Sequence, residues 1–149
     1  MDIQEFLDSQ KKVWAMQSRD KGAMCADDII IALKSIKDKD KTVIIVMNNK
    51  IYISDFAGDS WRGSYDLPAI GYKEYDEDEG NGYSVKTVIE NLRDIDGLEV
   101  TGYKGGEYTL SKFDPLFVAN YGSSNDCTAI VDIFEIDEFV ICRTKQDMY

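Results

Sequence analysis

The chain has 149 residues, of which 28 are acidic and 17 basic, so its formal net charge at pH 7 is −11. This balance disfavours direct binding of nucleic acid, because affinity for phosphate backbones comes mainly from Lys and Arg that displace counterions. The length fits one domain that can bury a core of its own. The acidic charge has two interpretations, which both stay open: it serves solubility, or it attracts a basic partner surface.

The sequence contains no histidine, which excludes histidine acid–base chemistry, Ser-His-Asp triads and His-ligated metals. Cys25, Cys127 and Cys142 have no metal-ligand spacing and indicate reduced thiols of a cytosolic protein. Cys127 has no candidate base beside it. We therefore expect a protein without catalytic residues, metal or cofactor. The acidic start does not resemble a signal peptide, and no apolar run has the length of a membrane span, so we expect no membrane partner.

Two helices are predicted within residues 1–37. Residues 2–20 place large apolar side chains at spacings near three and four, with acids early and cations later, which is typical of an amphipathic helix. Residues 26–37 predict a second helix capped by Asp27 or Asp28. Its expected apolar face is formed by Ile29, Ile30, Leu33 and Ile36.

Two hairpins are predicted in the rest of the chain. Residues 42–47 and 50–56 are apolar or alternating, and the intervening Asn48 and Asn49 tolerate a positive φ. Residues 128–144 predict the second hairpin, with Ile130, either Ile133 or Phe134, Val140 and Cys142 on its buried face. Its alternation is imperfect, so the inward and outward assignments can be shifted by one residue.

A third helix is predicted near residues 84–95, capped by Ser84 and ended by Gly97, with Val88, Ile89 and Leu92 facing inward. Together the elements predict one α+β domain over residues 1–149. Its core, residues 42–144, would contain an antiparallel sheet of about six or seven strands with about three helices in the domain, two of them N-terminal.

The stretch 57–72, AGDSWRGSYDLPAIGY, holds an arginine between glycines and aromatic rings. Arg62 can be a structural residue that pairs with Asp55, Asp59 or Asp66. It can equally recognise a phosphate or carboxylate through its two-pronged guanidinium while a planar group stacks on a nearby ring. Both interpretations stay open.

The stretch 102–122 has the sequence GYKGGEYTLSKFDPLFVANYG. Its pattern predicts a strand, a glycine turn, a second strand and a small polar loop after Gly122. Combined with the previous stretch, it supplies cations, backbone N–H groups and stacking faces that would suit a nucleotide-sized ligand in a cleft. Glycine and tyrosine at hairpin ends are also ordinary turn chemistry. The candidate ligand-binding residues are Trp61, Arg62, Gly63, Tyr65, Tyr103, Lys104, Gly105, Gly106, Tyr108, Asn120 and Tyr121.

Residues 74–82, EYDEDEGNG, form an acidic run without the ligand spacing of an EF-hand. We interpret this run as a mobile acidic loop. If the protein is instead an acidic inhibitor of a basic protein surface, this loop would contribute Asp76, Glu77, Asp78 and Glu79.

Three blocks in order, SWRGSYDLPAIGY at 60–72, GYKGGEYTL at 102–110 and DPLFVANYGSS at 114–124, resemble a family of small uncharacterised bacteriophage accessory proteins. The likeness covers about residues 42–144, and the N-terminal helices are less clearly part of it. It implies a phage protein in the bacterial cytoplasm. By analogy, such proteins counteract host defence by sequestering a nucleotide signal or by binding a defence protein. A regulator of phage or host metabolism is a third alternative, and an oligomer stays open.

Overall fold

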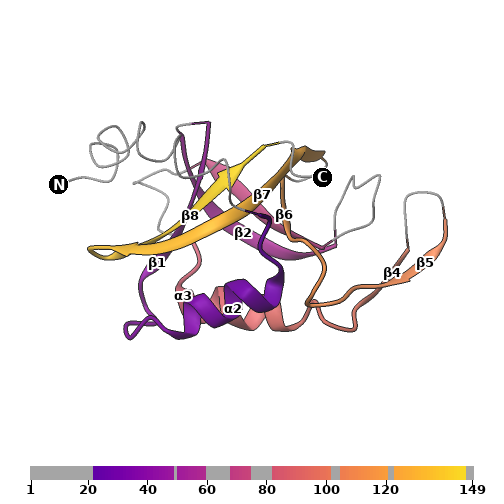
Figure 1. The fold of residues 1–149 in the computed structure, drawn as a ribbon, viewed down its shortest axis with the longest axis horizontal. Coiled ribbons are helices and arrows are strands. Elements are labelled where there is room, and N and C mark those ends of the chain that lie inside the picture. The colour runs from indigo at the N-terminus through magenta and orange to yellow at the C-terminus, as the bar shows by residue number, and fades with distance from the viewer. Residues whose placement is uncertain are drawn as a thin grey trace.

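The computed structural model describes residues 22–48, 50–59, 68–74, 82–101, 105–120 and 123–146. Its described helices are α2 (Ala26–Lys34) and α3 (Val85–Arg93). Its strands are β1 (Thr42–Met47), β2 (Lys50–Asp59), β3 (Pro68–Glu74), β4 (Glu99–Thr101), β5 (Glu107–Thr109), β6 (Phe117–Asn120), β7 (Ser123–Ile136) and β8 (Phe139–Lys145). Figure 1 shows the two helices side by side beneath the larger strands, and the ribbon formed by β4 and β5 projecting to one side.

The larger strands form a closed barrel in the order β1-β2-β3-β6-β7-β8. The barrel consists of two antiparallel three-stranded units joined by two parallel pairings, β3 with β6 and β1 with β8. The prediction of an antiparallel α+β sheet with three helices is therefore wrong. Closure depends on the register between strands that are far apart in the sequence, and local alternation carries no information about that register. Parallel neighbours also need a long crossover, and α3 and the β4–β5 ribbon lie within the crossover between β3 and β6.

Both predicted hairpins are confirmed. β1 pairs with β2 from Ile44 opposite Ile53 to Met47 opposite Lys50, and Asn48 in the turn has a φ of 50°. In the β7–β8 hairpin the register shifts between Ile130 and Asp132. Such a bulge reverses which side chains face inward along the strand, and this explains the imperfect alternation. β7 already begins at Ser123, so the small polar loop predicted after Gly122 is wrong.

The helix near 84–95 is confirmed as α3. The Ser84 hydroxyl accepts a hydrogen bond from the Thr87 N–H at 3.3 Å, and the predicted inward residues are buried. Burial also confirms the predicted apolar face of α2. However, α2 ends at Lys34 instead of residue 37, and its N-cap is Cys25, whose N–H donates to the Asp28 carboxylate at 3.2 Å. The helix predicted for residues 2–20 lies outside the described residues.

The strand side chains alternate between two apolar clusters. The main cluster unites both described helices with side chains of β1, β3, β6, β7 and β8. The second cluster contains Ile44 and Val46 of β1, Ile53 of β2 and Ile141 of β8. Because β1 is buried on both faces, it reads in sequence as the continuous apolar run TVIIVM. Successive residues of β1 thus pack alternately into the main cluster and the second cluster.

Candidate functional site

Most of the predicted ligand-binding residues lie outside the described part of the chain. These are Trp61, Arg62, Gly63, Tyr65, Tyr103, Lys104 and Tyr121. Gly105 and Gly106 are described in full, and Tyr108 and Asn120 only through their backbones in β5 and β6. The described strand ends nevertheless fix where each of these segments joins the barrel.

The segment that contains Arg62 joins the barrel at the end where β6 begins. Asp59, the last residue of β2, lies opposite Pro68, the first residue of β3. β3 then runs parallel to β6, with Ala69 opposite Phe117. The connection between residues 59 and 68 therefore leaves and re-enters the barrel beside the start of β6.

The β4–β5 ribbon, which carries the twin glycines, leads to the same end of the barrel. Its base is closed by the Gly97 N–H, which donates to the Leu110 carbonyl at 2.8 Å. The chain from Leu110 to the start of β6 is held by the Lys112 N–H, which donates to the Asp96 carboxylate at 2.9 Å. The Leu116 N–H donates to the Met24 carbonyl at 3.1 Å. The 59–68 connection and the chain that follows the ribbon thus both reach the start of β6, whereas the glycine turn lies at the far end of the ribbon.

Asn120 lies at the opposite end of β6. β6 pairs with β3 up to Ala119 opposite Gly71, and Asn120 is its last residue. At the rise of an extended strand, Asn120 is roughly 10 Å further along than Phe117. The described backbone therefore separates Asn120 from the two converging connections.

The turn of the ribbon is open to solvent. Gly105 has a φ of 87°, in the left-handed region that favours glycine, and Gly105 and Gly106 are both exposed. A Cβ atom placed on Gly105 would meet no other atom within 4 Å. Backbone conformation, and not crowding, requires glycine at this position. A ligand can therefore approach the backbone of the turn closely.

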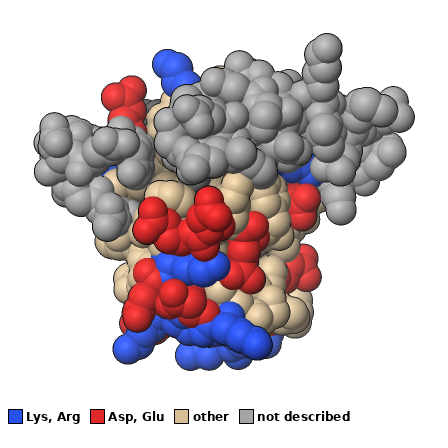
Figure 2. All heavy atoms as spheres, turned by 90° about the vertical axis from the view of Figure 1, so that its left-hand side faces the viewer, with Lys and Arg blue, Asp and Glu red and all other residues tan. Residues whose placement is uncertain are grey.

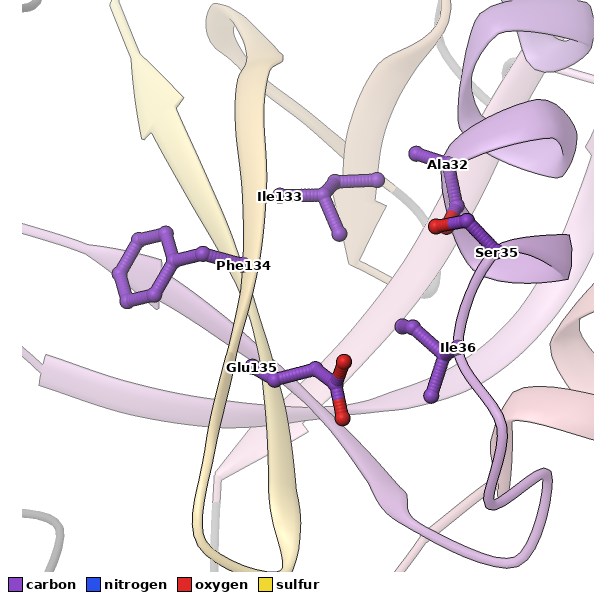
Figure 3. Close-up of a pocket in the computed structure, with 6 residues that line it drawn as sticks. All are labelled: Ala32, Ser35, Ile36, Ile133, Phe134 and Glu135. Atoms are coloured by element: carbon purple, nitrogen blue, oxygen red, sulfur yellow. The ribbon is translucent and has the colours of Figure 1, made fainter.

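A small hollow of about 230 Å³ lies between the end of α2 and β7, lined by Ala32, Ser35, Ile36, Ile133, Phe134 and Glu135. Figure 3 shows Ile133 directed toward the helix and Phe134 directed away from it. Ligand pockets usually measure about 300 to 1,000 Å³, so this hollow is too small for a nucleotide. Its polar groups already have partners: Ser35 donates to the Ala32 carbonyl at 2.6 Å, and Glu135 pairs with Lys41 at 2.7 Å. We assign no ligand to this hollow.

Exposed acidic side chains gather where two connections meet, a feature that the sequence analysis did not single out. The Thr42 N–H donates to the Glu138 carbonyl at 3.3 Å, which brings the α2–β1 connection beside the β7–β8 turn. Asp38 and Asp40 on the first and Asp137 and Glu138 on the second are all exposed. We call these four residues the acidic face. Figure 2 shows acidic side chains across this side of the molecule, with lysines among and below them. In the sequence, this acidic face corresponds to two charged runs, KDKDK at residues 37–41 and EIDE at residues 135–138.

Neither described cysteine has the environment of an activated nucleophile. Burial raises the pKa of the Cys142 thiol to about 12. The pKa of Cys25 is also raised, chiefly by burial. Because the thiolate is the reactive form, a raised pKa lowers reactivity at neutral pH. We therefore interpret these two thiols as structural residues and not as nucleophiles.

Comparison with protein-family models, with curated proteins and with solved structures gives no match for this chain. Within the described ranges, no three His, Cys, Asp or Glu side chains are grouped so that they could hold a metal ion. The helices that are described are too short or too polar to cross a membrane. What the protein binds must therefore be inferred from its own surfaces.

Proposed function

We propose that this protein is a noncatalytic accessory protein of the bacteriophage type, which acts in the bacterial cytoplasm and counteracts host defence by sequestering a nucleotide-like anionic small molecule. One observation carries the proposal: the connection after Asp59 and the chain that leaves the β4–β5 ribbon both reach the barrel at the start of β6. Arg62 belongs to the connection after Asp59, and Lys104 belongs to the turn between the paired residues Thr101 and Glu107 of the ribbon. We expect these two cations, from separate blocks, to face one anion.

Each part of the proposed site has a distinct role. Arg62 would hold a phosphate or carboxylate through two parallel hydrogen bonds, and Lys104 would add a second positive charge. The open turn at Gly105 and Gly106 supports close approach of backbone N–H groups to an anion. Rings such as Tyr65 would stack on the base. Asn120, at the other end of β6, would meet only the distal part of an extended ligand.

Calorimetry against cyclic and ADP-ribose-type nucleotides tests this function. We expect the unchanged protein to bind at least one of them, and we expect Arg62→Ala to weaken binding by about 2 kcal/mol, or roughly thirtyfold, because a charge-assisted pair of hydrogen bonds is lost. Lys86→Ala is the matched control, since Lys86 is an exposed cation in the first turn of α3, where its N–H donates to the Lys39 carbonyl at 3.0 Å. Absence of binding by the folded protein across the whole panel would refute the proposal.

A second candidate function is supported by the acidic face. Its four carboxylates, together with the acidic run at residues 74–79, would cover a basic surface of a defence effector or nuclease. Under this candidate, the neutralising double substitution Asp137→Asn with Glu138→Gln should weaken capture of a protein partner from bacterial lysate several-fold. Capture should also fall steeply between low and high salt. Arg62→Ala should leave capture unchanged, and salt-independent capture would contradict this function.

A further inference from the structure

The outer edges of the β4–β5 ribbon have no neighbour among the strands that the structure describes. Within the described strands, β4 and β5 form a separate two-stranded sheet and pair only with each other. Figure 1 shows the ribbon extending away from the barrel and the helices. A two-stranded sheet leaves one edge of each strand without a neighbour, and such an edge is a template for another strand. Each strand of the barrel, by contrast, has a hydrogen-bonded neighbour on both sides.

The register identifies which backbone groups face these open edges. The Leu110 N–H donates to the Leu98 carbonyl at 2.8 Å, and Val100 lies opposite Tyr108. In an antiparallel pair, every second residue directs its N–H and C=O toward the partner strand. The backbone groups of Leu98 and Val100 therefore face inward, and those of Thr101 face outward.

The same reasoning applies to the other residues of the ribbon. Glu99 lies opposite Thr109, and Thr101 lies opposite Glu107. All four residues therefore direct their backbone groups to the two outer edges. Their side chains share one face of the ribbon, and all four are exposed. The opposite face is partly covered, since Val100 packs against the main cluster.

The charge of the exposed face limits what can bind beside it. Glu99 and Glu107 are its ionisable groups, and the register places each carboxylate opposite a threonine. An incoming strand with lysine or arginine on this face would pair with these carboxylates, whereas an acidic strand would be repelled. A second copy of this chain is disfavoured by the charge of −11 that each copy carries.

We propose that an open edge of the β4–β5 ribbon binds an extended, Lys- or Arg-bearing segment of a partner protein by strand addition. Main-chain hydrogen bonds would supply affinity, and Glu99 and Glu107 would select basic side chains. This site is separate from the proposed nucleotide site, which uses side chains of the turn and of the β2–β3 connection.

Proline and valine substitutions at the two outward-facing threonines provide the test. Thr101→Pro removes an N–H from the outer edge of β4, and Thr109→Pro does so for β5, while the bonds between the two strands are retained. Thr101→Val and Thr109→Val are the matched controls, because valine retains the N–H and suits a strand. Near-ultraviolet circular dichroism would verify that every variant is folded.

The probe is a fluorescently labelled ten-residue peptide of alternating lysine and valine, compared with its glutamate counterpart by fluorescence anisotropy. We expect the lysine peptide to bind, the glutamate peptide not to bind, and one proline variant to lose about tenfold in affinity while its valine control loses little. Equal binding by proline and valine variants, or by both peptides, would overturn the proposal. A protein dimer in native mass spectrometry that the proline variants abolish would also overturn it, because the edge would then bind a second copy. Calorimetry with nucleotides tests the proposed function, and the peptide assay tests strand addition. Failure of one proposal is therefore distinguished from failure of the other.

Discussion

Replacement of Gly82 by alanine is expected to lower the free energy of unfolding by about 2 to 5 kcal/mol, which combines the cost of a strained backbone with the cost of an overfilled core. Gly82 has a φ of 68°, which side chains rarely adopt, and an added Cβ would lie 2.6 Å from the Cβ of Ile53. The Ile53 side chain is only 4% exposed and belongs to the second cluster. Because the overlap involves an atom next to the β2 backbone, it cannot be relieved by moving a flexible side-chain end.

The close approach at Gly82 allows the chain to enter α3 directly beside β1. The next carbonyl, that of Tyr83, accepts the Val43 N–H at 3.0 Å, and Ser84 then caps the helix. Gly97→Ala is the matched control, since Gly97 has a φ of 82° but open space around its Cβ position. We expect this control to cost about 1 to 2 kcal/mol, from strain alone. Urea unfolding followed by circular dichroism measures both variants, and equal losses would show that the contact with Ile53 is not what requires glycine.

The elements that the sequence predicted correctly are those determined by neighbouring residues. The β1–β2 hairpin follows from a turn that tolerates positive φ, and α3 follows from the Ser84 cap and its inward apolar residues. The barrel does not follow from such signals. Its closure requires β1 to lie parallel to β8, with Val43 opposite Val140, across almost one hundred residues. An apolar strand such as TVIIVM is compatible with many partners, so its composition could not identify this one.

The candidate site was predicted as one group because two stretches supply cations, glycine N–H groups and aromatic rings, but one such stretch can span a whole strand. In DPLFVANYGSS, Pro115 lies just before β6 and forms an isolated bridge with Cys25, and Asn120 lies at the end of β6. The two ends of a strand point to opposite ends of a barrel, so proximity in sequence does not imply a shared site. The parallel register of β3 and β6 supplies the missing information, since it aligns the connection after Asp59 with the start of the block.

Replacement of Leu92 by alanine is expected to lower the free energy of unfolding by about 2 to 5 kcal/mol. Leu92 is on the inward face of α3 and has 0% exposure, so removal of its side chain leaves a cavity that the surrounding structure fills only partly. Leu98→Ala is the matched control, because that leucine is 39% exposed in the segment that follows α3. We expect the control to lose about 1 kcal/mol or less.

The unfolding curve of Leu92→Ala also tests whether the helices and the barrel form one domain. The main cluster contains Leu33 of α2, Leu92 of α3, and buried strand residues such as Val118 of β6 and Val140 of β8. Since helices and strands share this cluster, α3 should not unfold while the barrel remains intact. The variant should therefore shift one transition, seen at the same urea concentration in the helical signal at about 222 nm and in the near-ultraviolet signal. Loss of the helical signal at a lower urea concentration would show that α2 and α3 form a unit separable from the barrel, and would contradict a single domain.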